Sequence, residues 1–258
     1  MKKKFIDESM KQIELENKLF FGDCLKVMPN IPNKSVDMIL ADLPFNQTKN
    51  KWDIIIPFGE LWEQYNRIIK DNGAIALFAQ GFFTAQLIMS NPKMYRYDLI
   101  YHKGDRATGF LNAKVQPMRN HEQILLFYKK KPTYNPQFTE GKPLHSKGKK
   151  YKTKEGINNN YGHYDTKFDS GREGKTQKYP KSVLTFDKPH PAIHPTQKPV
   201  ALCEWLIKTY TNENEIVLDN VMGIGTTCIA AKKLNRRYIG IESEEEYYKK
   251  ALELIDTK

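Results

Sequence analysis

The sequence predicts an α/β fold with a mostly parallel sheet that helices cover on both faces. Short apolar runs such as VDMILA (36–41) and AIALFA (74–79) are typical of buried strands. Between them, residues 58–71 repeat apolar side chains at helical spacing. Strands that alternate with helices favour parallel pairing, because each crossover helix packs back onto the sheet. A long basic stretch after residue 130 interrupts this alternation.

Composition limits the class of protein. The 258 residues are 40% hydrophobic and 12% aromatic, which is enough for a folded core. No stretch is as long as a membrane span, and the N-terminal MKKKFIDESM lacks the apolar segment of a signal peptide. Three scattered cysteines without metal-ligand spacing fit a reducing compartment. We therefore expect a cytoplasmic protein with no membrane partner, no disulfide framework and no metal site.

The elements of the first half can be placed in order. The apolar positions from Phe58 to Ile69 predict a helix, and Asp71-Asn72-Gly73 predicts a turn that precedes the strand at 74–79. The other elements expected here are a short helix at 84–91 and strands at 95–101 and 122–128.

Residues 131–190 differ from the rest of the chain. They have no apolar periodicity and are rich in Gly, Asn and Lys, with a Tyr or Phe every several residues. From Lys129 to Lys188 there are 15 Lys and Arg against 6 Asp and Glu, so this part accounts for +9 of the net charge of +11. This combination favours a nucleic-acid contact region, in which lysines would contact phosphates and aromatic rings would contact bases. The alternative is a solvated or disordered insertion. The candidate DNA contacts are Lys147, Lys149, Lys150, Lys152 and Arg172.

The basic stretch divides the chain into three parts. We expect residues 1–130 and 191–258 to form two halves of one α/β domain, with 131–190 as an insertion. In the last part, helical spacing predicts a helix at 200–210. A strand, a glycine turn, a helix and another strand then follow, and a final helix is expected to begin at Ser243, because acidic residues follow it.

The glycine turn indicates a nucleoside site. Gly223 and Gly225 follow the strand IVLD, and Glu242 ends the next strand seventeen residues beyond Gly225. An acid in that place can accept hydrogen bonds from both ribose hydroxyls, while the glycines let a ligand approach the backbone. Cys228 stands where the dinucleotide fingerprint has its third glycine, which favours a cofactor without pyrophosphate, namely S-adenosyl-L-methionine (AdoMet). A turn that serves only packing is the alternative.

Asp42-Leu43-Pro44-Phe45, at the end of the first apolar strand, permits a specific chemistry. A strand end with a proline turn is the plain interpretation. The chemical interpretation concerns an exocyclic amine of a nucleobase, whose lone pair is delocalised into the ring. The Asp42 carboxylate and the Leu43 carbonyl would accept the two amine hydrogens and free the lone pair. Phe45 would stack on the ring and Pro44 would fix the turn.

Two further observations bear on this run. Trp52 and Asp53 follow it closely and are expected to line the base pocket, with structural packing as the alternative for Trp52. Methylation at C5 of cytosine needs a thiolate nucleophile, and Cys24, Cys203 and Cys228 each lack the preceding proline of such a site. That activity is therefore rejected.

Four segments together resemble the beta group of amino-methylating (N6-adenine or N4-cytosine) DNA methyltransferases. DLPF looks like their D-P-P-Y motif, VMGIGTT (221–227) resembles their F-x-G-x-G motif, and HPTQKP (194–199) is similar to the segment before it. Residues 21–45 resemble the run that leads into their catalytic strand. The resemblance implies a Rossmann-like AdoMet-dependent methyltransferase fold with circularly permuted motif order, and a target-recognition insertion at 131–190.

The resemblance also implies roles for individual residues. Asp42, Leu43, Pro44 and Phe45 would hold the base, with Asp42 also beside the cofactor. Glu242 would bind the ribose. The other cofactor contacts implied are Asp23 and Cys24 at the adenine, His194, Thr196 and Lys198 at the methionine end, and Asp219, Val221, Met222, Gly223, Gly225, Thr226 and Thr227 along the turn. Leu43, Phe45, Val221 and Ile224 depart from the family pattern, and Ile224 places a bulky side chain in the tight turn.

The predicted function is methyl transfer from AdoMet to the N6 amine of adenine in double-stranded DNA, by base flipping and direct attack. Adenine is preferred over cytosine N4 because the motif opens with Asp42, where the cytosine enzymes more often have Ser. A catalytically silent DNA-binding relative is less favoured because it would not need the Asp42 acceptor, and a nicotinamide oxidoreductase because it has no use for DLPF. The sequence leaves open the recognition sequence, a homodimer, and a cognate restriction endonuclease in a restriction-modification system.

Overall fold

The computed structural model forms two compact units. The larger unit comprises Met1–Asn135 and Lys181–Lys258, and the smaller one comprises Pro136–Pro180. The boundaries expected at residues 131 and 190 stay a prediction. The structure describes residues 16–46, 48, 50, 52–143, 175–189 and 197–256.

The larger unit contains an eight-stranded sheet in the order β1-β10-β9-β2-β3-β5-β4-β8. Every neighbouring pair is parallel except those of β5, which runs antiparallel to both β3 and β4. The predicted mostly parallel sheet is thus confirmed. Its strands are β1 (Lys18–Phe21), β2 (Val36–Ala41), β3 (Ile69–Ala79), β4 (Tyr95–His102), β5 (His121–Phe127), β8 (Val183–Thr185), β9 (Ile216–Asp219) and β10 (Arg237–Glu242).

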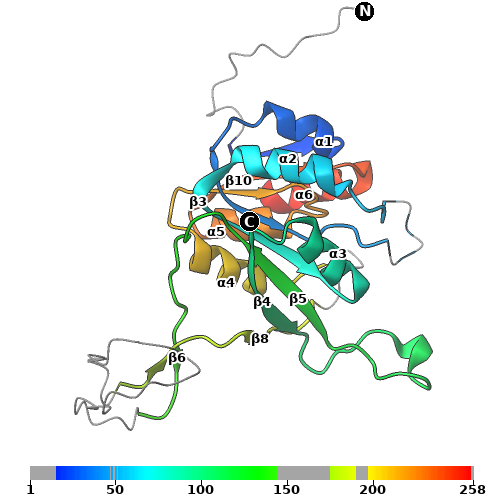
Figure 1. Cartoon of the computed structure of the whole chain (residues 1–258), viewed down its shortest axis with the longest axis vertical. Helices are drawn as coiled ribbons and strands as arrows, with labels where there is room; N and C mark the ends of the chain where they lie inside the picture. Colours follow the sequence, from blue (N-terminus) through cyan, green and yellow to red (C-terminus); the bar gives the residue numbers. More distant parts are fainter. Residues whose placement is uncertain are drawn as a thin grey trace, which may run out of the picture. The chain divides into compact units, whose positions relative to one another are not determined.

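Helices pack on both faces of this sheet (Figure 1). Alternate residues of β2 belong to different cores: Ile39 packs with α2 and α3, whereas Met38 packs with α4, α5 and α6. This explains why β2 is apolar throughout and buried at every position. The helices are α1 (Cys24–Val27), α2 (Phe58–Ile68), α3 (Phe82–Ser90), α4 (Val200–Tyr210), α5 (Thr226–Lys233) and α6 (Glu245–Asp256), with 3-10 turns η2 (Met28–Asn30) and η3 (Phe110–Asn112).

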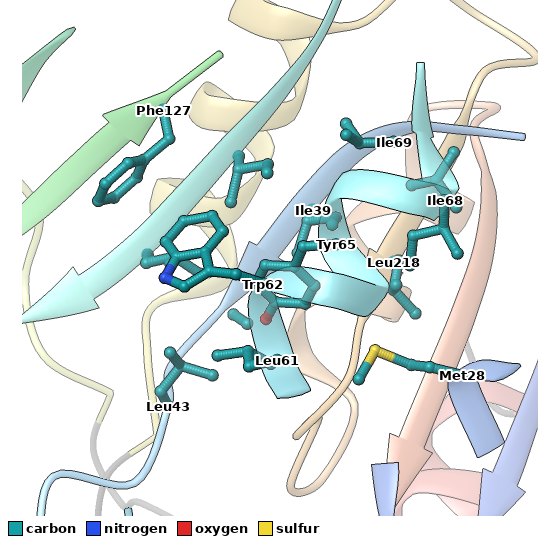
Figure 2. Close-up of a cluster of buried hydrophobic side chains, with 14 of the residues drawn as sticks. Met28, Ile39, Leu43, Leu61, Trp62, Tyr65, Ile68, Ile69, Phe127 and Leu218 are labelled. Carbon is teal, nitrogen blue, oxygen red and sulfur yellow. The ribbon is translucent and has the colours of Figure 1, made fainter. Parts of the chain in front are cut away.

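Helix α2 also supports the carboxyl edge of the sheet. Its apolar stripe buries Leu61, Trp62 and Tyr65 against the sheet, as the helical spacing predicts (Figure 2). The Tyr65 hydroxyl donates a hydrogen bond to Asn220 Oδ1 at 2.6 Å, directly after β9. The helix therefore holds the loop between β9 and α5 in place.

The turn predicted at Asp71-Asn72-Gly73 is wrong, because these residues lie within β3. The register shifts there from Val36 opposite Ile69 to Met38 opposite Ala74, so residues 70–73 form a bulge opposite Asp37. The buried Asp37 carboxylate accepts hydrogen bonds from Lys70 Nζ (2.6 Å) and the Ile216 amide (2.9 Å). A Cβ at Gly73 would lie 2.8 Å from the Asp37 carbonyl oxygen, so the bulge requires glycine there.

The smaller unit contains a short antiparallel pair in its described part. Strands β6 (Thr139–Glu140) and β7 (Gln177–Lys178) pair, and the rings of Phe138 and Tyr179 lie 5.0 Å apart between centroids. The predicted DNA contacts Lys147, Lys149, Lys150, Lys152 and Arg172 lie outside the described residues. In the described part of the chain, no helix is both long and apolar enough to cross a membrane.

Candidate active site

Three neighbouring parallel strands end in acids at the same edge of the sheet. Asp42 follows β2, Asp219 ends β9 and Glu242 ends β10. Because the carboxyl ends of parallel strands meet at one edge, their side chains line one cleft of about 470 Å³. That size suits a nucleoside-sized ligand. Asp23 and Glu244 also line the cleft, so its charge favours a cationic ligand.

Most of the predicted cofactor residues lie at this cleft. Gly225 does not line it; its left-handed backbone, with φ of 79°, caps the start of α5. His194 and Thr196 lie outside the described residues. The predicted residues that line the cleft are Asp23, Cys24, Asp42, Lys198, Asp219, Val221, Met222, Gly223, Thr226, Thr227 and Glu242.

Glu242 fixes the glycine turn. Its Oε2 accepts a hydrogen bond from the Gly223 amide and its Oε1 from the Glu244 amide, each at 2.8 Å. Gly223 has φ of 54°, which a glycine adopts without strain. Burial raises the pKa of Glu242 and, more strongly, that of Asp219, to about 7. Each Glu242 oxygen retains a lone pair for a further donor.

Asp42 belongs to a buried cluster of alternating charges. Its Oδ2 pairs with Lys198 Nζ, which also lies 3.1 Å from Glu122 Oε2. Glu122 Oε1 in turn lies 2.6 Å from Lys103 Nζ. The cluster thus contains two carboxylates and two ammonium groups. Lys198 Nζ also lies 4.8 Å above the centre of the Phe78 ring.

The cluster separates the pKa values of its two carboxyls. Burial raises the pKa of Asp42 to about 6, although Lys198 partly opposes this shift. Burial also disfavours the Glu122 carboxylate, but Lys198 and Lys103 together lower its pKa to about 2. Asp42 Oδ1 is buried and has no hydrogen-bond partner among the described residues. This oxygen is therefore available to a donor from a ligand.

A second cavity of about 210 Å³ lies next to the cleft. Among its lining residues are Leu43, Phe45 and Tyr101, whose buried hydroxyl lacks a hydrogen-bond partner in the described part of the chain. Burial raises the pKa of Tyr101 to about 12, so this hydroxyl is neutral. The residues that line both spaces are Asp42, Pro44, Trp52, Gln197 and Lys198. Two ligands can therefore meet beside the Asp42 carboxylate.

Asp53 holds the turn that follows Pro44. Its buried carboxylate accepts hydrogen bonds from the amides of Phe45 (2.8 Å), Asn46 (2.8 Å) and Thr48 (2.6 Å). Asp53 and Trp52 both line the second cavity, beside the turn that the Asp53 carboxylate holds.

Sequence reasoning missed the part of the site that comes from β4 and β5. Glu122 lies at the start of β5, and Lys103 directly follows β4. The available signal was a charged residue beside each apolar run, Lys103 after the first and Glu122 before the second. Lys188 and Thr108 also line the second cavity and were not predicted.

Comparisons with known proteins agree with this arrangement. An N6/N4-type DNA methylase family model matches residues 36–253. The type II methyltransferase M.HpaI of Haemophilus parainfluenzae is 27% identical, over 95% of this chain and 76% of its own length. M1.MboII of Moraxella bovis, also named a type II methyltransferase, is 28% identical over 91% of this chain and 95% of its own length. YubD of Escherichia coli (strain K12), which is named a methylase, is 44% identical over 88% of this chain and 85% of its own length.

Solved structures share the fold. The M1.HpyAVI complex with SAM, which is AdoMet, has a TM-score of 0.61 and 23% identity, and the match covers 92% of this chain and 98% of that one. The cytosine-N4-specific PvuII DNA methyltransferase has a TM-score of 0.65 and 14% identity. The match covers 92% of this chain and 85% of that one. The predicted α/β methyltransferase fold is thereby confirmed.

Proposed function

Because this chain belongs to the N6/N4 family of DNA methylases, we propose that it transfers a methyl group from AdoMet to the N6 amine of adenine in double-stranded DNA. M.HpaI and M1.MboII are named type II methyltransferases, and we place the chain in the same functional class. The preference for adenine rests on Asp42 as the opening residue of the DLPF run.

AdoMet is the cofactor of this family, and the cleft fits it. When bound, AdoMet supplies an electrophilic methyl group on a sulfonium. The acids Asp23, Asp42, Asp219 and Glu242 suit its positive charges. Glu242, with a lone pair left on each oxygen, would take the ribose hydroxyls.

The observation that supports the chemistry most is Oδ1 of Asp42, which lies at the junction of the two cavities and has no partner within the described ranges of the chain. The extruded base would occupy the smaller cavity, with Phe45 beside its ring. Asp42 Oδ1 and the Leu43 carbonyl would accept the two amine hydrogens. Lys198 would stay on Oδ2, because the amine does not need that oxygen. The nitrogen lone pair then forms the new N–C bond as the S–C bond breaks, and Asp42 can take the proton that the methylated amine releases.

Methyl transfer from labelled AdoMet to unmethylated genomic DNA tests this function. After digestion to nucleosides and chromatography, we expect the label in N6-methyladenine. Label in N4-methylcytosine would keep the mechanism and overturn the choice of base. No label in DNA, from a folded protein that binds AdoMet, would overturn the proposal.

The fall of kcat/KM on the acid side of the pH profile should reflect protonation of the Asp42 carboxylate. Since the ionised carboxylate accepts the amine hydrogens, kcat/KM should fall as pH drops through about 6, where Asp42 becomes protonated. Well below this pKa the decline should approach about tenfold per pH unit. Initial rates across this range, with circular dichroism at each pH to verify folding, provide the measurement. A flat profile through pH 6 would contradict this assignment.

Glu122→Gln is a matched variant for that profile. The Glu122 charge raises the pKa of Asp42, so its removal should lower that pKa and move the acid limb to lower pH. An acid limb that stays in place would show that another group is titrating.

Glu242→Gln should weaken AdoMet binding about tenfold or more, because the amide offers one acceptor oxygen where Glu242 offers two. Isothermal titration calorimetry measures this affinity. Glu244→Gln removes the same charge at the same cleft and is the control, expected to bind AdoMet nearly as the native chain does. Equal losses in both variants would mean that overall charge, and not the acceptor, governs binding.

A further inference from the structure

The segment between β4 and β5 projects away from the sheet (Figure 1). It exposes a group of large apolar side chains. We call residues 104–119 the β4–β5 tip. Phe110 is 75% exposed, Leu111 84%, Val115 83% and Met118 50%. Four such side chains within nine residues are more than the scattered exposure usual for a protein surface and are typical of an interaction site.

The tip has a defined local structure. The Lys103 amide donates to the Asn120 carbonyl at 2.8 Å, and Thr108 and Arg119 exchange backbone hydrogen bonds of 2.8 and 2.9 Å. Gly109, with φ of 88°, turns the chain into the short helix η3, which contains Phe110 and Leu111. Hydrogen bonds from the amides of residues 115 and 116 to the Asn112 carbonyl close the end of the tip. The backbone therefore presents the apolar side chains to solvent from a folded loop.

Charge indicates the partner. The β4–β5 tip contains Arg106, Lys114 and Arg119 against Asp105, a net charge of +2. Apolar side chains flanked by basic ones are suited to bind duplex DNA. The apolar side chains can unstack a base step, and the basic side chains can contact the phosphates. A purely apolar protein partner would not need the basic residues.

The tip is continuous with the second cavity. Lys103 and Thr108, at its base, line the space that would receive the extruded base. A duplex with one nucleotide in that cavity would therefore lie next to Phe110 and Leu111. We infer that the β4–β5 tip is a wedge, which inserts Phe110 and Leu111 into the stack where the extruded nucleotide leaves a gap. Filling that gap offsets part of the unstacking cost.

This inference rests on the proposed function, because the cavity must hold a base. Its test uses a short fluorescein-labelled duplex, either intact or with one abasic position, so that no recognition sequence is needed. Fluorescence anisotropy compares the native chain with Phe110→Ala/Leu111→Ala. The native chain should prefer the abasic duplex, and the double variant should lose this preference and bind that duplex about tenfold more weakly.

Leu252→Ala is the control, since Leu252 is a partly exposed apolar residue on α6, which packs near β1 at the opposite edge of the sheet. Unchanged affinity and preference in the double variant would overturn the inference. So would a double variant that loses self-association in sedimentation while it retains its DNA binding, because the tip would then contact a second copy. Tip-dependent preference without methyl transfer by the native chain would support the wedge and overturn the proposed function.

Discussion

Asp42→Asn is expected to lower kcat for methyl transfer roughly a hundred- to a thousandfold, because the amide lacks the negative charge that stabilises the developing cationic amine. The substitution preserves the side-chain shape, so the cavity should keep its form. AdoMet binding should change far less than kcat, since Glu242 and the glycine turn remain. Single-turnover methyl transfer with pre-bound AdoMet measures the chemical step, and Asp42→Ala in parallel removes the acceptor altogether.

Asp37→Asn is the matched control for this experiment. Asp37 is a buried carboxylate on β2, the strand that leads into Asp42, but it pairs with Lys70 and the Ile216 amide and lines neither cavity. Its loss should lower the free energy of unfolding, while the folded fraction should keep nearly native kcat. Native kcat in Asp42→Asn would refute the proposed role of this carboxylate.

Asp53→Ala should both destabilise the chain and lower its activity. Three amides, those of Phe45, Asn46 and Thr48, would lose a charged acceptor. We expect the free energy of unfolding to fall by about 2–4 kcal/mol, because charge-assisted hydrogen bonds are stronger than neutral ones and three amide donors would lose their partner at once. With the turn loosened, kcat should fall at least about tenfold, since Pro44 and Phe45 would no longer be positioned.

Urea unfolding and steady-state kinetics together test the Asp53 prediction. Asp53→Asn retains one carbonyl acceptor and should give intermediate losses of stability and of kcat. AdoMet affinity should remain near native in both variants, because Asp53 does not line the larger cleft. A stable Asp53→Ala chain with native kcat would show that the turn holds its shape without this carboxylate.

The sequence could predict a site residue where that residue directly follows or ends an apolar strand. The apolar run before Asp42 and the strand before Asp219 indicate buried parallel strands, and their ends had to meet at one edge. Glu122 could not be placed this way. Its strand, β5, enters antiparallel between β3 and β4, and chain order does not show that neighbour relation.

Local residue preferences also gave one wrong element. Asp71-Asn72-Gly73 has the composition of a turn, yet the pairing of β2 with β3 and the needs of buried Asp37 make it a bulge. Tertiary contacts here outweigh local preference. The role of Asp53, by contrast, concerns amides only five to eight residues away, but no residue pattern distinguishes such a carboxylate from one on a solvated loop.

The order Lys103, Glu122, Lys198, Asp42 has a consequence for how such a protein could evolve. Each charge in this row is compensated by its neighbour, so a change at one position alters what its neighbours tolerate. Asp42→Ser would leave Lys198 with Glu122 alone and an uncompensated positive charge near the reacting amine. A lineage that exchanged one target base for another would therefore have to pass through a weakened intermediate, or substitute position 198 or 103 together with position 42.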